Sequence, residues 1–301
     1  MKKLKMDKSI KRTFIPGDPW IYYKIYSGAK TSDYILTEII KPVAEKLVSG
    51  KIIDKWFFIR YADPKHHLRV RFHLINPEDI GLIINSLYPD FEKLINQDMI
   101  WKIQIDTYQR EIERYGENTI KLAEELFYCD SKMIVSFLDL IEGEKGEELR
   151  WLFGLRMIDV LLDSFEFTIE NKCDFLEQLK AGFAGEFLMD RFLKKQLDDK
   201  FRKERDKINE YLALTKVTNP EYAPILEVFD TYTIEINPIA EKIKILINKD
   251  NFTVEIRSLL SSFIHMTMNR LFKSKNRVHE MVCYDFLYRY YKSLLARSKN
   301  S

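Results

Sequence analysis

The sequence predicts an α+β fold, with a ferredoxin-like βαββαβ N-terminal part followed by a mainly helical C-terminal part. Two observations lead to this expectation. In the first third of the chain, segments rich in aromatic and β-branched residues alternate with segments of helical periodicity. After Tyr115-Gly116 the apolar residues recur mainly every three or four positions and glycine becomes sparse.

The N-terminal elements follow from period and from end signals. Strands are predicted at residues 20–26, 56–61, 68–74 and 101–108, where apolar and aromatic side chains show a period of about two. A helix is predicted over 31–48, with Thr31 or Ser32 as N-cap and Gly50 just past its end. Another is predicted over 77–95, with Asn76 as N-cap. The resulting order places both helices on one sheet face and leaves the other face available.

The boundary between the two parts is placed at residue 116. The segment 1–116 forms the α+β part, and 117–301 forms the helical part, for which six to eight helices are expected. No flexible linker separates them. We therefore expect the helices to pack directly on the sheet and the chain to fold as one compact unit.

Composition indicates a folded protein that acts through local charge. The chain has 301 residues, 46% of them hydrophobic, and 48 basic residues against 46 acidic ones. A formal charge of +2 gives no global field that would favour nucleic acid or a membrane surface. Three scattered cysteines suit a reducing cytoplasm, and no apolar run has membrane-spanning length. Phosphate-loop and metal-ligand motifs are absent from the sequence, so we expect no metal and no cofactor.

The most informative segment is 56–72, which includes most of the basic strand predicted at 68–74. Side chains alternate along a strand, so His67, Arg69, Arg71 and His73 share one face, opposite an apolar face. With Arg60, the two arginines could clamp a carboxylate or phosphate. The alternative is an internal ion network that pairs them with carboxylates later in the chain, at Asp106, Glu111 or Glu113.

A second candidate lies on the helix expected around 258–272. His265 and Asn269 are four residues apart and share a face with Ser261, on a helix that is otherwise apolar. A histidine held by a hydrogen-bonding neighbour can act as a general base or acid. The alternative is a histidine that is simply satisfied on the surface or by its own helix.

Five fragments in order resemble a known family, the glutamate-elimination C-terminal domain of class I lantibiotic dehydratases, which also occurs as separate thiopeptide-type bacteriocin biosynthesis proteins. The fragments are Trp20-Ile21-Tyr22-Tyr23-Lys24, Phe58-Ile59-Arg60-Tyr61 with Asp63-Pro64, His67-Leu68-Arg69-Val70-Arg71-Phe72, Glu113-Arg114-Tyr115-Gly116, and His265-Met266 with Asn269-Arg270-Leu271. Together they span nearly the whole chain. The family's usual second glycine after Arg-Tyr-Gly is Glu117 here.

The resemblance implies a lyase that acts on a peptide. In the family, Ser or Thr of a ribosomally made precursor is glutamylated from glutamyl-tRNA by a separate, larger domain, which is absent from this chain. The elimination domain then expels glutamate and leaves dehydroalanine or dehydrobutyrine. By motif, the catalytic residues are expected at His265, Arg69, Arg71 and Arg114. Residues expected to bind the substrate are Arg60, Tyr108, Asn269 and Arg270.

The resemblance leaves two other functions open. One is the thiopeptide cycloaddition that makes a pyridine ring, carried out by enzymes of the same fold. The other is a non-catalytic subunit that binds the leader peptide. In each case the expected partners are the precursor peptide and a separate glutamylating protein, without direct nucleic-acid binding, in the cytoplasm. The oligomeric state is left open, with a homodimer among the options.

Overall fold

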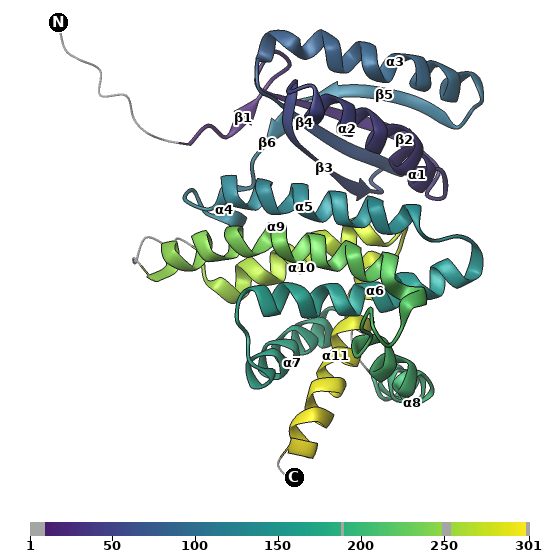
Figure 1. Cartoon of the computed structure of the whole chain (residues 1–301), viewed down its shortest axis with the longest axis vertical. Coiled ribbons are helices and arrows are strands. Elements are labelled where there is room, and N and C mark those ends of the chain that lie inside the picture. Colours follow the sequence, from purple (N-terminus) through teal and green to yellow (C-terminus); the bar gives the residue numbers. More distant parts are fainter. Residues whose placement is uncertain (1–9, 188–189, 249–253, 299–301) are drawn as a thin grey trace, which may run out of the picture.

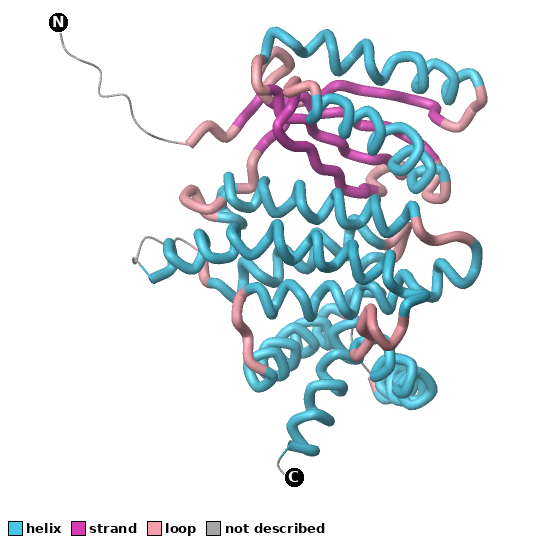
Figure 2. Tube along the Cα trace, viewed as in Figure 1, coloured by secondary structure: helices cyan, strands magenta, loops and turns pink. Residues whose placement is uncertain are grey.

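The computed structural model describes residues 10–187, 190–248 and 254–298. Its strands lie in the N-terminal part and helices make up most of the remainder, as Figure 2 shows. The first half comprises β1 (Thr13–Phe14), β2 (Trp20–Ser27), α1 (Thr31–Tyr34), a π-helical segment (Ile35–Ile40), α2 (Lys41–Ser49), β3 (Ile53–Tyr61), β4 (His67–Leu74), a 3₁₀ turn (Pro77–Asp79), α3 (Ile80–Asn96), β5 (Ile100–Asp106) and β6 (Tyr108–Gln109).

The helical part follows without a long connection. Its helices are α4 (Ile112–Tyr115), α5 (Ile120–Asp139), α6 (Gly143–Ser164), α7 (Ile169–Glu186), α8 (Arg191–Leu212), α9 (Ala223–Asn248), α10 (Ile256–Leu271) and α11 (Asn276–Ser298), with a 3₁₀ turn at Pro220–Tyr222. Seven of these are longer than one turn among the described residues. The prediction of six to eight helices is therefore confirmed.

The main sheet has four antiparallel strands in the order β3-β4-β2-β5. The apolar side chains of β4, among them Val70 and Phe72, are fully buried and face the same side as Tyr23, whose ring contacts Phe91 of α3 at 6.1 Å. Helices α2 and α3 thus form a layer on one face of the sheet, and α5 lies on the side of the sheet toward the helical part (Figure 1). The predicted alternation along β4 agrees with this register.

The last predicted strand, 101–108, is wrong in one respect, because the structure divides it. Strand β5 ends at Asp106, whose side chain accepts a hydrogen bond from the Thr107 backbone N–H at 2.7 Å. The next two residues, Tyr108 and Gln109, pair instead with β1 as a separate two-stranded sheet. This bend carries the chain out of the main sheet and turns the Tyr108 side chain into the interior.

Side chains from distant helices cover the outer edge of β3. The Phe58 N–H donates to Ser131 Oγ of α5 at 3.2 Å, and the Phe58 carbonyl accepts from Arg270 Nε at 2.8 Å. Asn269 makes two hydrogen bonds with the backbone of Arg60, one to its N–H and one to its carbonyl, each of 2.9 Å. An edge strand otherwise offers unpaired backbone groups. Helices α5 and α10 are therefore fixed to the sheet by its own ladder groups.

Candidate functional site

Helix α10 presents its polar stripe beside the sheet because its other faces are filled. Leu259, Leu260, Phe263, Ile264, Met268 and Leu271 are all fully buried. The helix begins where the Glu255 side chain accepts a hydrogen bond from the Ser258 N–H at 2.8 Å. At 3.6 residues per turn, His265 then falls on the same side as Ser262 and Asn269. The packing of the apolar face thus orients the histidine.

The imidazole of His265 is held by a buried carboxylate from α11. Its Nδ1 lies 2.9 Å from Glu280 Oε2, and Glu280 is only 2% exposed, whereas the histidine side chain is 25% exposed. Glu280 also accepts hydrogen bonds from Tyr284 Oη at 2.9 Å and from Arg277 at 2.8 Å. Because an ionised carboxylate only accepts, we assign the proton to Nδ1. That tautomer leaves Nε2 free to take up a proton.

Arg114 reaches the same stripe from α4. Its Nε donates to Ser262 Oγ at 3.0 Å, one turn before His265 on α10, and its side chain is 34% exposed. A second contact, of 3.5 Å, joins Arg114 to Glu111. The short helix that carries Arg114 ends at Gly116, whose φ of 77° is a conformation that glycine adopts readily. The structure therefore places the Arg114 side chain against Ser262, one turn before His265 on α10.

Arg71 lies deep beneath this surface in an aromatic cage. Its guanidinium carbon is 4.4 Å from the Tyr22 ring centre, 4.9 Å from that of Tyr108 and 5.2 Å from that of Phe57. Burial lowers the pKa of Arg71. Among the described residues, no carboxylate lies within ion-pair distance of it. A buried cation without a counter-ion is costly, so this position is suited to meeting an anion.

A cavity of about 40 Å³ connects Arg71 to α10. Met266, which follows His265, lines it together with Tyr115 and Arg270. Three buried polar atoms there have no hydrogen-bonding partner among the described residues: Arg71 Nε, Arg270 Nη2 and Tyr115 Oη. Burial also raises the pKa of the Tyr115 hydroxyl, which keeps it protonated. The residues that line the cavity therefore include three donors without an acceptor among the described residues, together with the carboxylate of Glu111.

Arg69 lies two residues before Arg71 on the same sheet face but nearer to solvent. Its guanidinium stacks on the Tyr61 ring, 3.5 Å from the ring centre, and its Nε donates to His67 Nε2 at 3.1 Å. His67 in turn donates from Nδ1 to the Lys65 carbonyl at 2.8 Å. Burial lowers the pKa of His67. The neutral imidazole therefore accepts the hydrogen bond that orients Arg69.

The structure separates Arg60 from Arg69 and Arg71, so their grouping as one clamp is wrong. In the β3–β4 register Arg60 lies opposite Leu68, whereas Arg69 lies opposite Ile59, so the arginines project from opposite faces. Arg60 is 2% exposed and pairs with Asp33 at 2.6 Å. Burial by itself would raise the pKa of Asp33, but its cationic neighbours hold the pKa below the usual value.

The expected carboxylate partners of the arginines are also engaged elsewhere. Asp106 pairs with Lys24, and Glu113 pairs with Arg12 at 2.6 Å. Of these three carboxylates, Glu111 forms an ion pair with an arginine of the candidate site, at 3.5 Å from Arg114. Among the described residues no ion pair joins Arg69 or Arg71 to these carboxylates, although Glu111 lines the Arg71 cavity and Lys24, with a smaller contribution from Arg69, lowers the pKa of Asp106.

Three of the residues expected to bind the substrate have internal partners. Asn269 bonds the β3 backbone, as described above. Arg270 is fully buried and pairs with Asp130 at 3.2 Å while its Nε bonds the β3 edge. The hydroxyl of Tyr108 donates to Glu124 at 2.9 Å, beside a short ion pair between Glu124 and Arg110. These contacts are sufficient to explain each side chain structurally.

The structure also identifies two residues that the sequence did not single out for a role. Glu280 orients His265, and Tyr115 lines the cavity of Arg71. Glu280 lies on a different helix, 15 residues later, so no helical spacing reveals the pair. Taken together, a proton acceptor lies beside cationic donors, a combination suited to removing a proton and stabilising the negative charge that develops.

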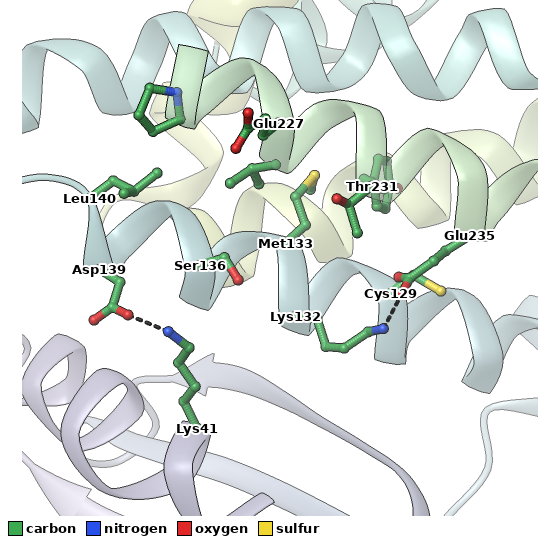
Figure 3. A pocket seen from close by; sticks show the side chains of 13 residues that line it. Lys41, Cys129, Lys132, Met133, Ser136, Asp139, Leu140, Glu227, Thr231 and Glu235 are labelled. Atoms are coloured by element: carbon green, nitrogen blue, oxygen red, sulfur yellow. Dashed lines mark hydrogen bonds and ion pairs between the residues drawn. The ribbon is translucent and has the colours of Figure 1, made fainter. Parts of the chain in front are cut away.

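Another cavity, of about 410 Å³, lies between α5 and α9. Figure 3 shows its two lysines, Lys41 and Lys132, each directed at a carboxylate, Asp139 and Glu235 respectively. Cys129, which also lines it, has its pKa raised to about 12 by burial and is therefore unreactive as a thiolate. None of the expected site residues lines this cavity, and its charges are internally compensated.

Two further properties concern the described ranges only. Within them, no cluster of three or more metal-binding side chains occurs. None of the helices there combines the length and apolar character needed to cross a bilayer.

Comparison with known proteins gives a consistent result. The family described as lantibiotic biosynthesis dehydratase C-term matches residues 20–291. The subtilin biosynthesis protein SpaB of Bacillus subtilis is 26% identical over 286 residues, covering 90% of this chain and 25% of its own length. The nisin biosynthesis protein NisB of Lactococcus lactis subsp. lactis is 27% identical over 277 residues, covering 91% and 26%. The chain thus spans about a quarter of the length of these relatives.

Solved structures share the fold. The tRNA-dependent lantibiotic dehydratase MibB from Microbispora sp. 107891 aligns with a TM-score of 0.70 and 18% identity, covering 95% of this chain and 29% of that one. TsrL aligns with a TM-score of 0.68 and 12% identity, covering 91% and 94%. The pyridine synthase TbtD from thiomuracin biosynthesis aligns with a TM-score of 0.61 and 10% identity, covering 90% of this chain and 97% of that one. At these identities the likeness establishes the fold alone.

Proposed function

Because this chain belongs to the lantibiotic dehydratase C-terminal family, we propose that it is a lyase that eliminates glutamate from glutamylated Ser or Thr of a precursor peptide. The products are dehydroalanine or dehydrobutyrine and free glutamate. One observation carries the proposal: His265, backed by the buried Glu280, lies on the α10 surface that also binds Arg114 and borders the cavity of Arg71.

The geometry suggests how the reaction proceeds. His265 Nε2 takes the Cα proton, and its Nδ1–H bond to Glu280 stabilises the imidazolium that forms. The electron pair of the broken C–H bond becomes the Cα=Cβ double bond, and the Cβ–O bond breaks with glutamate leaving as a carboxylate. Arg69, Arg71 and Arg114 supply positive charge to the developing enolate and to the departing group.

The roles of the remaining expected residues are narrower in this proposal. Arg60, Tyr108, Asn269 and Arg270 act through their internal bonds, by fixing α10 and the cage around Arg71, rather than by touching the peptide. The peptide binds across the exposed end of the site, where Arg69 and Arg114 reach solvent.

We also propose the finer architecture expected from the sequence. The order of elements β-α-β-β-α-β and the sheet order β3-β4-β2-β5 support a ferredoxin-like unit within residues 1–116. The bonds from α10 to β3 support one compact unit with the helical part, 117–301. A separate glutamyl-tRNA-dependent protein would supply the glutamylated peptide in the cytoplasm.

The test is to incubate the purified protein with a synthetic glutamylated peptide and to follow glutamate release and peptide mass. We expect release with a matching loss of mass for the wild type, and intact glutamylated peptide with His265→Ala. Glu280→Gln should retain part of the activity, because the amide still accepts from Nδ1–H but lacks the charge. His73→Ala is the matched control, since His73 also pairs with a carboxylate, Asp54, but lies away from α10.

The same assay separates the other functions. Undiminished elimination by His265→Ala would contradict the assignment of the base. Ring formation from a peptide with two dehydroalanines would indicate cycloaddition to a pyridine, the kind of product for which the pyridine synthase TbtD, whose fold this chain shares, is named. Peptide binding without turnover would indicate a leader-binding subunit.

A further inference from the structure

The two edges of the main sheet differ in whether their outer backbone groups have hydrogen-bonding partners among the described residues. The β3 edge is satisfied by side chains from α5 and α10, as described above. Strand β5, at the other end of the order β3-β4-β2-β5, pairs only with β2 among the described residues. Its outer backbone groups are therefore available to another strand, a position that monomeric proteins usually protect.

An apolar groove accompanies this free edge. A cavity of about 500 Å³ lies between α3 and β5. Four large apolar side chains that line it are between 39% and 57% exposed: Ile84, Tyr88, Ile95 and Ile105. Trp101, also on β5, is 51% exposed. Exposed apolar residues scattered singly need no explanation, but a group that lines a groove beside an unpaired strand indicates an interface.

We propose that a second copy of this chain covers the edge, with β5 pairing antiparallel to its own counterpart about a twofold axis at Gln104. In this register Ile103 lies opposite the partner's Ile105, on the face that lines the groove. Lys102 lies opposite the partner's Asp106 on the other face. The twofold axis repeats each pair, so the two sheets join into one of eight strands.

Charge decides between registers and favours a second copy as the occupant. Among the described residues, Lys102 has no carboxylate within ion-pair distance, and its amine lies 5.4 Å from the Tyr26 ring centre. The register centred on Gln104 places the partner's Asp106 opposite Lys102, so that this carboxylate has two cationic neighbours, Lys102 and the Lys24 of its own chain. A register centred on Ile103 would instead place Asp106 opposite the buried Ile100. The strand is thus complementary to itself in one alignment, as an isologous interface requires.

The proposed interface leaves the candidate site open. Helix α10 is bonded to β3, and two strands, β4 and β2, separate β3 from β5. Each copy therefore keeps its own His265 and Arg114 away from the contact. Dimerisation through β5 does not depend on the proposed lyase activity, so an experiment can contradict either proposal without contradicting the other.

The first test is the mass in solution, measured by sedimentation velocity and light scattering over a concentration series. We expect a reversible dimer for the wild type. Ile105→Glu should be monomeric, because it places a carboxylate in the groove. The matched control is Ile234→Glu on α9, which changes an isoleucine that is 73% exposed elsewhere, and this variant should remain dimeric. Circular dichroism verifies that each variant is folded.

The second test is a charge exchange. Lys102→Asp should raise the dimer dissociation constant about tenfold, since the twofold axis turns one substitution into two like-charge pairs. Adding Asp106→Lys should restore the affinity, and Asp106→Lys alone measures the effect of losing its pair with Lys24. Trp101 gives an independent readout, because acrylamide should quench its fluorescence less in the dimer. A wild type that stays monomeric throughout, a dimeric Ile105→Glu, or a charge exchange without restoration would each overturn the proposal.

Discussion

Replacement of Asn269 by alanine is the most direct test of how α10 is held. The sequence suggests that Asn269 binds the substrate, whereas in the structure both polar atoms of its amide bond the backbone of Arg60. If the structural role is correct, Asn269→Ala should destabilise the fold. If the residue binds the substrate instead, stability should be unaffected and KM should rise.

The expected loss follows from two hydrogen bonds. Each contributes about 0.5–1.5 kcal/mol net, so Asn269→Ala should lower the free energy of unfolding by about 2 kcal/mol. Unfolding entropy scales with length, at about 0.6 kcal/mol/K for 301 residues. The melting temperature should therefore fall by about 3 °C. Asn269→Asp should cost more than alanine, because a carboxylate oxygen would face the Arg60 carbonyl.

Differential scanning calorimetry and the glutamate-release assay together decide the matter. Ser261→Ala on the same stripe of α10 is the control for a polar residue lost from this helix. The reasoning is refuted if Asn269→Ala melts with the wild type, or if aspartate is tolerated as well as asparagine. Activity should fall in parallel with stability, since the same helix carries His265.

Two further predictions concern neighbours of the arginines: Tyr115, which lines the cavity of Arg71, and His67, which bonds Arg69. Tyr115→Phe removes a hydroxyl from the cavity of Arg71. It should lower kcat/KM about tenfold, which corresponds to the loss of one hydrogen bond, and the protein should stay folded. An unchanged kcat/KM would show that the hydroxyl has no role in the reaction. Burial lowers the pKa of His67. Below about pH 6.5 the unfolded state therefore binds more protons at this residue than the folded state does. The free energy of unfolding should fall as the pH drops from 7.5 towards 5.5. Urea titrations at both pH values should show it, and His67→Gln should weaken the dependence.

Much of the N-terminal part could be predicted from local pattern. The alternation along 67–74 places Arg69 and Arg71 on one face because the strand period is two, and this needs no knowledge of neighbours. The end of β5 could not be foreseen, because it depends on the Asp106 side chain and on pairing of the next residues with β1, far away in sequence.

The site could be predicted only in part, for a related reason. The stripe on α10 marks His265 from spacing alone, and motif resemblance adds Arg114. The face from which Arg60 projects depends on the register between two strands, which periodicity in one strand does not determine. The carboxylate that holds His265 comes from the next helix, so it emerges only from the packing of α10 against α11.

The hydrogen bonds between the edge of β3 and side chains of the helical part have a consequence for folding kinetics. Its last backbone groups bond side chains that lie 209 residues further along the chain. Contacts this remote form late, because the whole intervening polypeptide must first be brought into place. Until then the edge of β3 has unpaired backbone groups that can bind another strand. The protein is therefore most prone to aggregate before the last quarter of the chain has been synthesised and has packed on the sheet.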